Sequence, residues 1–471
     1  MMCNNIILIT VDCFRYDRCG FNGYQHQTTP FLDKLSSESI IFDSAFATGT
    51  YTPESFPGIF AGLHANSTSY VGDLICKSIP SNTQTITSQL RKEGFDTLAT
   101  VSNPHLSPDR NFDYGFDQYQ NLRLKTSPSM VEKKSKTSEK GILDKVRNFF
   151  EQRLEEQTYY PNLYVLPYLV HRYRQFNDWP TIDGEKIRTE LISQLERYSN
   201  TEDPTFAWCH FNDAHAPIHP LKSPKVHDVG GPIRQLSADS ARIANIKHSR
   251  CSKMYDNALR YIDTQIKLIF DGLSNMSLLD NTAVIVVGDH GEGLGEHGVY
   301  NHPWHYMYDT LLHVPLLIWT SNRETQTRVS APFSLAWLHE IISKLSGFDL
   351  GSFPTECQGD PFVDTYRGPV VSDSVSPSGY SIAIRDGDNK YLNYDISDVE
   401  YHTHCDVFNR NSICLDLSTG SDEDTAEFDI IENKMSTLIE DHQTDPQQVP
   451  EISDNISRNS EHRLKQLGYL K

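Results

Sequence analysis

Acidic and imidazole side chains directly follow apolar runs at two distant places in the sequence. Asp12 comes after NIILITV (5–11), and Asp289 and His290 come after TAVIVVG (282–288). Continuous apolar runs of this length are typical of parallel strands buried on both faces. The carboxyl ends of such strands meet at one edge of an open sheet, where ligands bind, so we expect these side chains to converge. Two carboxylates and an imidazole are suited to a divalent metal ion, although Asp289 could instead cap a turn.

The charge balance of the chain also favours a metal site. The 471 residues include 62 acidic and 42 basic side chains, a formal net charge of -20, and the basic residues form no stripe. This balance argues against a nucleic-acid partner or an anionic membrane partner. An anionic substrate would need a local positive centre, and a bound metal ion supplies one.

The N-terminus and the cysteines give no indication of export. The first residues, MMCNNIILITVDCF, have no basic region before the short apolar run and no small-residue cleavage site after it. No stretch approaches the roughly 18 apolar residues of a membrane span. The nine cysteines contain no CxxC pair, which indicates neither a disulfide framework nor a zinc ribbon. We therefore expect a cytoplasmic protein with no membrane partner.

The elements that must position these side chains alternate between strands and helices. Further strand-like runs are DTLATVS (96–102) and TFAWCHF (205–211), and helical patterns lie at 83–92 and 249–274. In the longer helix apolar residues recur at helical spacing. The alternation predicts an α/β fold with a large, mostly parallel sheet flanked by helices.

Composition divides the chain into a large and a small part. We predict a catalytic domain over residues 1–350, with an exposed insertion at about 123–200 that begins with a Lys-, Ser- and Glu-rich stretch. The strand-like, turn-rich sequence that follows predicts a small C-terminal antiparallel α+β subdomain at 355–442. A polar tail is expected at 443–471.

Four segments, in order along the chain, resemble the sulfatase family within the alkaline-phosphatase-like superfamily. They are NIILITVDCFRYD with TTPFLDKL, TYTPESFPGIFAGLH, HFNDAHAPI, and VIVVGDHGEGLGEHG with LLHVPLLIW. Near the C-terminus, AIRDGDNKYL and RLKQLGYLK also resemble the family's second subdomain and tail. The resemblance implies a metal-dependent hydrolase of sulfate or phosphate esters, with Asp12, Asp289 and His290 as metal ligands.

Two ligand positions depart from the family pattern. Many sulfatases carry a second acid where this chain has Cys13, and another position that usually carries Asn has His290. Fewer carboxylates and an imidazole suit calcium less well than manganese, magnesium or zinc. We expect one divalent ion, with Ca, Mg, Mn and Zn all left open.

The nucleophile position departs from the pattern as well. Typical sulfatases carry a Cys or Ser, in a Cys-x-Pro-x-Arg context, that is converted to formylglycine; alignment on IFAGL places Thr52 there, and Phe56 at the Arg. Threonine cannot undergo this conversion, because its Cβ bears a methyl group. A metal-bound Thr hydroxyl can instead lose its proton and attack phosphorus or sulfur directly, as in phosphoglycerol and phosphoethanolamine transferases of the superfamily. Thr52 is thus expected as nucleophile and metal ligand, unless it only N-caps the helix that begins at Pro53.

Three histidines complete the site that the resemblance implies. His215, in NDAHAPI, is similar to the family's His-x-Pro element and would neutralise or protonate the leaving oxygen. His105, in SNPHLSP, matches the His of a Lys-x-His element in which Asn103 replaces the Lys. His305, in HPWHYMYD, lies near another family Lys or His, with His302 as a close competitor. Each of these three histidines could instead have a structural role. Three other histidines match no motif element: His210, His219 and His297.

Three functions are compatible with these residues. The leading interpretation is hydrolysis of a small-molecule or glycan sulfate or phosphate ester through metal-activated Thr52. The rival within enzymes is a phosphoryl or phosphoglycol transferase with a phospho-Thr intermediate, although such enzymes usually carry membrane anchors. A catalytically silent member that binds an anionic glycan or protein is the third, because the family's Arg and Lys are missing. Retention of Asp12, Asp289 and His290 favours an enzyme.

Overall fold

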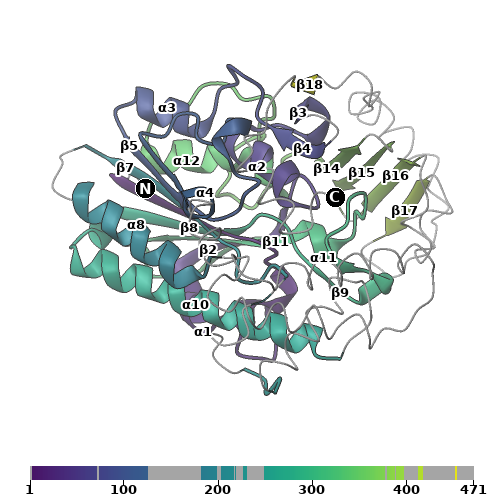
Figure 1. Cartoon of the computed structure of the whole chain (residues 1–471), viewed down its shortest axis with the longest axis horizontal. Coiled ribbons are helices and arrows are strands. Elements are labelled where there is room, and N and C mark those ends of the chain that lie inside the picture. Colours follow the sequence, from purple (N-terminus) through teal and green to yellow (C-terminus); the bar gives the residue numbers. More distant parts are fainter. Residues whose placement is uncertain are drawn as a thin grey trace, which may run out of the picture.

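A nine-stranded sheet forms the centre of the molecule (Figure 1). The computed structural model describes residues 3–71, 74–125, 182–198, 203–216, 218, 226–230, 249–376, 379–387, 389–396, 412–416 and 451–452. The strand order is β12 (Thr327–Val329), β2 (Ser39–Phe46), β11 (His313–Thr320), β8 (Thr282–Gly288), β1 (Asn5–Val11), β7 (Thr205–Phe211), β5 (Asp96–Val101) and β6 (Gln118–Asn121), and β13 (Phe333–Ser334) pairs with β2. The strands from β8 to β6 are parallel, and β11 is antiparallel to both of its neighbours. The predicted mostly parallel sheet is confirmed.

Helices cover both faces of this sheet (Figure 1). One face packs against α2 (Thr52–Ala61), α3 (Ile86–Lys92) and α12 (Leu338–Ser346), and the other against α1 (Pro30–Leu35), α8 (Gly184–Tyr198) and α10 (Cys251–Asn275). The strands therefore separate two apolar cores. The helix predicted at 249–274 is α10, and its apolar stripe is buried: Met254, Leu259, Ile262, Ile266 and Ile269.

Two described helices reach into the range predicted as an exposed insertion, α4 (Leu122–Lys125) at its start and α8 near its end, and α8 is not fully exposed. Helix α8 buries Ile187, Leu191 and Leu195 in the core shared with α10, because these residues recur on one helical face. The preceding residues 126–181 lie outside the described part of the chain.

A separate antiparallel sheet lies toward the C-terminus. It consists of β14 (Val370–Ser376), β15 (Gly379–Asp386), β16 (Asn389–Ile396) and β17 (Ser412–Asp416), paired in sequence order. The small antiparallel unit expected after residue 355 is thus present. Strand β14 joins it to the large sheet, since Ser372 Oγ donates to Ala47 O over 2.6 Å and Asp373 N to Thr48 O over 2.8 Å. Of the tail predicted at 443–471, only β18 (Glu451–Ile452) is described, paired with β3 (Ser69–Val71), which in turn pairs with β4 (Leu74–Ser78).

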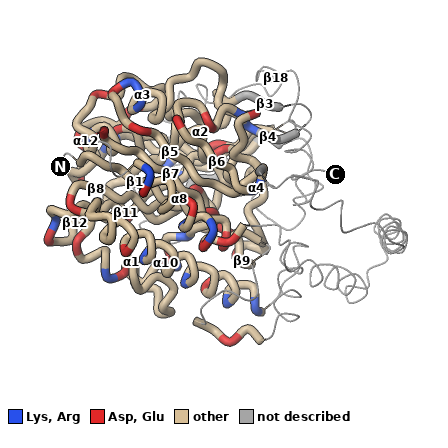
Figure 2. Tube along the Cα trace, turned by 60° about the vertical axis from the view of Figure 1, so that its left-hand side comes forward, with Lys and Arg blue, Asp and Glu red and all other residues tan. Residues whose placement is uncertain are grey.

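Basic and acidic residues are scattered among each other along the described trace (Figure 2). Figure 2 shows no continuous basic stripe on this part of the chain in the view that it gives. Among the described residues, no helix combines the length and the apolar character that crossing a membrane requires.

Candidate metal centre

Asp12, Asn212 and Asp289 leave the large sheet side by side. The register pairs Val11 with Phe211 on one side and with Gly288 on the other, so the next residue of each strand emerges at the same edge. Both carboxylates are fully buried, and the Nδ2 group of Asn212 donates to Asp12 Oδ2 over 2.6 Å. The expected convergence of the two acids is therefore present, and it follows from the parallel register.

Thr52, the first residue of helix α2, places its hydroxyl beside Asp289 and His290. Thr52 Oγ1 donates to Asp289 Oδ2 over 3.1 Å and lies 3.3 Å from His290 Nε2. Tyr51, and not Thr52, is the N-cap residue, and no side chain caps the helix. The alternative that Thr52 serves as a helix cap is thus excluded by the geometry, and its hydroxyl faces the acids and the imidazole.

Hydrogen bonding fixes the tautomer of His290. Its Nδ1 lies 2.9 Å from the carbonyl oxygen of Gly291, which can only accept, so Nδ1 carries the proton. The lone pair of Nε2 then points toward Asp12 Oδ1 at 3.4 Å and Asp289 Oδ2 at 3.6 Å. A backbone carbonyl that orients the far nitrogen of an imidazole in this way is characteristic of metal-binding histidines.

The two carboxylates carry more negative charge than the described side chains neutralise. Within the described part of the chain, the basic side chains within 4 Å of them are the imidazoles of His210 and His290, which are charged only if protonated, and no Lys or Arg is among them. Burial, and then the charge of Asp12, raise the pKa of Asp289 well above its usual value. A divalent cation would remove this repulsion, and carboxylate, hydroxyl and imidazole donors fit one. The residues present thus fit a metal ion, with Asp12, Thr52, Asp289 and His290 as the donors.

Two further side chains hold Asp12. His210, on β7, has its Nε2 atom 3.6 Å from Asp12 Oδ2, and the ligand atoms of His210, Asp12 and Asp289 all lie within 4.8 Å of one another. The amide of Asn103 donates to Asp12 Oδ2 over 3.2 Å and to Thr52 Oγ1 over 3.4 Å. Asn103 therefore links the acid to the hydroxyl from the position where the family pattern has Lys.

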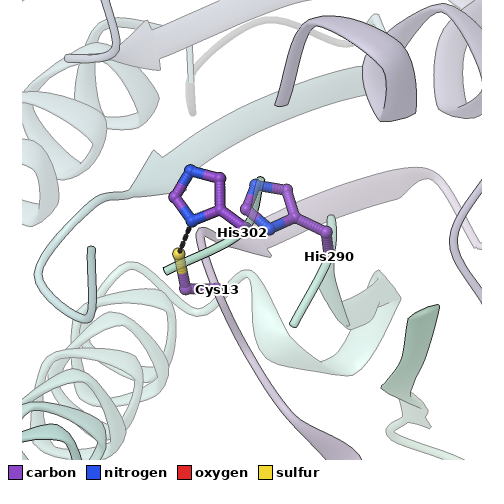
Figure 3. Close-up of side chains that lie close together, drawn as sticks. All are labelled: Cys13, His290 and His302. Atoms are coloured by element: carbon purple, nitrogen blue, oxygen red, sulfur yellow. Dashed lines mark hydrogen bonds between the residues drawn. The ribbon is translucent and has the colours of Figure 1, made fainter. Parts of the chain in front are cut away.

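A group of imidazoles and a thiol adjoins this centre. The ring of His302 lies 4.7 Å from that of His290 and 4.8 Å from that of His215, between ring centroids. His302 Nδ1 is 3.6 Å from Cys13 Sγ, and Figure 3 shows these two side chains facing each other beside His290. The Nδ1 group of His215 donates to the carbonyl of its neighbour Ala216, which leaves Nε2 as an acceptor in the neutral ring.

His105 has the opposite tautomer. Arg110 Nη1 lies 2.9 Å from His105 Nδ1, and a guanidinium can only donate, so Nδ1 accepts and the neutral ring carries its proton on Nε2. Burial, and then the charge of Arg110, hold the pKa of His105 well below its usual value. His105 is therefore a neutral hydrogen-bond donor.

His305 lies against the small sheet. Its Nδ1 is 3.2 Å from Ser381 Oγ and its Nε2 is 2.8 Å from Ser376 Oγ. With both ring nitrogens directed to these serines, His305 fastens its loop to the small sheet. Of the two histidines that the sequence left in competition, His302 is the one that the structure brings beside His290.

The comparison with family models decides the identity of the chain. The Sulfatase family model matches residues 4–347, which covers the large sheet and every donor described above. The chain belongs to the Sulfatase family. Enzymes of this family are metal-dependent, and the match supports a hydrolase-type enzyme.

Relatives of this sulfatase-family protein differ in what they do. It is 23% identical to the iduronate 2-sulfatase of Mus musculus over 359 residues, which is 68% of this chain and 60% of that protein. It is 22% identical to an arylsulfatase of Clostridium perfringens over 379 residues, 75% of this chain and 76% of the relative. Over 143 residues it is 31% identical to phosphoethanolamine transferase EptA of Salmonella typhimurium, which is 30% of this chain and 25% of EptA. The chain thus spans about 60% and 25% of the lengths of iduronate 2-sulfatase and EptA.

Solved structures support the fold of this sulfatase-family protein. The phosphonate monoester hydrolase of Agrobacterium radiobacter superposes with a TM-score of 0.60 at 16% identity, covering 93% of this chain and 96% of that one. The structure titled Ps i-CgsB in complex with k-i-k-neocarrahexaose gives a TM-score of 0.63 at 16% identity, covering 99% and 97%. At this identity the likeness concerns the fold alone.

Proposed function

We propose that this sulfatase-family protein is a divalent-metal-dependent hydrolase of sulfate or phosphate esters in which Thr52 is the nucleophile. The observation that carries the proposal is the position of Thr52 Oγ1, within 3.1 Å of Asp289 Oδ2 and 3.3 Å of His290 Nε2. These are two of the donors that fit a metal ion. When bound there, the ion would lower the pKa of the hydroxyl and neutralise charge on the ester oxygens.

The chain's own groups prepare the hydroxyl for attack. Its proton is directed at Asp289 Oδ2, while the amide of Asn103 donates to Oγ1 from another direction. Asn103 would therefore also stabilise negative charge as it forms on Thr52 Oγ1. In the first step Thr52 Oγ1 releases its proton to solvent and bonds to phosphorus or sulfur, while the bond to the alcohol oxygen of the substrate breaks and that oxygen takes up a proton from protonated His215.

The histidine tautomers support roles for His105 and His215. His105 carries its proton on Nε2 and is suited to donate to a non-bridging oxygen of the ester. In its neutral form, which burial favours by lowering its pKa, His215 has an acceptor at Nε2. It is suited to take a proton from the water that breaks the Thr52 ester and releases sulfate or phosphate. The protonated ring would then be the acid for the next leaving group, which is the role that the sequence predicted.

A transferase remains the second candidate, and one observation favours it. The segment related to EptA is more similar in sequence than the longer matches to sulfatases, at 31% against 22–23% identity. A transferase would use the same Thr52 ester but pass the group to an alcohol in place of water. For either candidate, the proposal includes sulfate, phosphate and phosphonate esters as substrate classes.

One turnover panel tests both candidates. Aryl sulfates, phosphate monoesters, phosphodiesters and phosphonates would be incubated with metal-free protein and with Zn²⁺, Mn²⁺, Mg²⁺ or Ca²⁺ added. We expect metal-dependent release of acid from at least one ester, and an added alcohol acceptor should leave the rate of acid release unchanged. If an added alcohol lowers the rate of acid release while the sulfated or phosphorylated alcohol accumulates, the protein is a transferase. No turnover of any ester with any metal would contradict both candidate functions.

A further inference from the structure

Cys13 occupies a position from which its sulfur faces the metal centre. The side chain is fully buried, and its Sγ donates to Asp12 Oδ1 over 3.1 Å. The residue has a φ of 63°, in the left-handed region that non-glycine residues rarely adopt. Two hydrogen bonds hold this turn: Tyr255 Oη donates to Cys13 O over 2.5 Å, and Cys13 N donates to Asp289 Oδ1 over 3.3 Å.

The donor atoms around Cys13 lie close enough together to share one ion. Cys13 Sγ is 3.1 Å from Asp12 Oδ1 and 3.6 Å from His302 Nδ1, and Asp12 Oδ1 is 3.4 Å from His290 Nε2. Two ligands about 2.0–2.3 Å from the same zinc ion lie roughly 3.3–3.7 Å from each other, and two of these three distances fall in that range. The ligand atoms of Cys13, His290 and His302 also lie within 4.8 Å of one another, with two of the three side chains buried (Figure 3).

We propose that Cys13, as a thiolate, and His302 bind the catalytic metal ion in addition to the donors described above, Asp12 and His290 among them, and that this donor set selects zinc. The inference rests on the proposed function for the existence of the metal centre, and goes beyond it in naming the ion and two further ligands. Thiolate and imidazole ligands favour zinc, whereas calcium and magnesium take oxygen ligands. On binding, the thiol proton now directed at Asp12 passes to solvent, and the sulfur lone pair that it leaves forms the bond to the metal.

The neighbours of His302 are compatible with this role. Its Nδ1 is 3.4 Å from Glu292 Oε2, so in the metal-free protein that nitrogen carries a proton directed at the carboxylate. A metal ion would replace the proton there, and the fully buried Glu292 would then place a negative charge beside the ion. The side chain of His302 is 11% exposed, which leaves this corner of the site within reach of an entering ion.

Cobalt substitution tests the thiolate ligand without reference to turnover. Metal-free full-length protein would be titrated with Co²⁺, and the near-ultraviolet absorption that a cobalt–thiolate bond produces would be recorded. We expect this band in the wild type and in Cys357→Ser, which removes another buried thiol, but not in Cys13→Ser. Zinc affinity, measured by competition with a chromophoric chelator, should fall in Cys13→Ser by more than the roughly 10- to 100-fold typical of losing an outer-shell partner.

A second variant keeps the test decisive if Cys13→Ser does not fold. Cys13→Asp introduces an oxygen ligand at the same position, and it should bind Ca²⁺ or Mg²⁺ more tightly than the wild type does while losing the cobalt–thiolate band. Cobalt bound to the wild type without that band would overturn the thiolate ligand but leave the metal-dependent Thr52 mechanism standing. Failure of the wild type to bind any divalent ion would overturn the proposed function as well.

Discussion

Two buried clusters of acids flank the start of helix α2, and they differ in how their charge is neutralised. In the first, Asp12 and Asp289 meet beside Thr52, and no Lys or Arg of the described residues pairs with either acid. In the second, Glu54 and Asp373 lie near the buried ammonium group of Lys77, whose charge acts on Glu54. We name these the metal centre and the lysine network.

Hydrogen bonds within the lysine network reach each of its charged members, although Glu54 Oε2 is buried without a hydrogen-bond partner among the described residues. Asp373 accepts the backbone N–H groups of Ala65 and Asn66 over 2.8 and 3.0 Å, Glu54 Oε1 accepts from Ser374 Oγ over 2.9 Å, and Lys77 Nζ donates to Ala65 O over 3.1 Å. Burial still raises the pKa of Glu54 to about 8 and lowers that of Lys77 to about 8, so desolvation acts here too. Burial of acidic side chains therefore does not by itself indicate a metal-binding site. A buried acid cluster that lacks a cation of its own needs one from solution.

The largest expected difference between the clusters is in turnover. Thr52→Ala removes the proposed nucleophile and should lower kcat by about 10⁴-fold or more while the protein stays folded and binds metal. Ser374→Ala is the matched control, since it removes a hydroxyl that bonds to a buried acid of the lysine network. It should keep near wild-type kcat. Equal losses in the two variants, measured as initial rates on the best substrate of the panel, would contradict the distinction.

Removal of the cation from the lysine network should have the next largest effect. Lys77→Met leaves Glu54 and Asp373 buried without it, and we expect the free energy of unfolding to fall by about 3–5 kcal/mol, measured by denaturant titration. The double variant Lys77→Met, Glu54→Gln should recover part of the loss, because it removes one of the two uncompensated acids. Bound metal per folded chain should remain unchanged in both. A Lys77→Met variant as stable as the wild type would show that this network does not hold the fold.

Addition of metal should stabilise the wild type by a smaller amount. An ion present at 100 times its dissociation constant adds about 2.7 kcal/mol to the free energy of unfolding. Lys77→Met should show the same gain, because its metal centre is intact. The double variant Asp289→Asn, His290→Ala should show none, and elemental analysis should find no stoichiometric metal in it. Metal retained by that variant would remove the centre that we describe.

The smallest expected effect is an increase in the free energy of unfolding, whereas most substitutions of buried residues lower it. Asp289→Asn removes a carboxyl group whose ionisation is opposed by burial and then by the charge of Asp12, while the amide oxygen can still accept the N–H groups of Cys13 and His290. In metal-free protein we expect the free energy of unfolding to rise by about 1 kcal/mol. Asp373→Asn, in the lysine network, should instead lower it by about 1–3 kcal/mol. If both substitutions destabilise equally, the two clusters are alike and the comparison fails.

Much of this arrangement could be predicted from the sequence because its elements have strong local patterns. Continuous apolar runs gave β1 and β8, and helical periodicity gave α10. The meeting of Asp12 with Asp289 follows from parallel register, which brings equivalent strand ends together. The same argument applies to β7 and would have found Asn212, the residue that follows this strand.

Other parts of the site depend on contacts that no local pattern encodes. His210 matches no motif element, and its role beside Asp12 arises only from the pairing of β7 with β1. The choice between His302 and His305 depends on a loop in which His297, Asn301 and His305 all have positive φ, so its path cannot be inferred from spacing. The cytoplasmic location predicted from the sequence stays a prediction, which fractionation of the native protein would test.

The most direct test of the central claim, that Thr52 attacks the ester under activation by the metal centre, is to trap the covalent intermediate. Protein turning over a slow substrate would be quenched in acid, digested and mapped by mass spectrometry. The account predicts a phosphoryl or sulfuryl mass on Thr52 that requires added metal, disappears in Thr52→Ala and persists in Ser374→Ala. A labelled residue other than Thr52, or a Thr52→Ala variant with undiminished turnover, would contradict it.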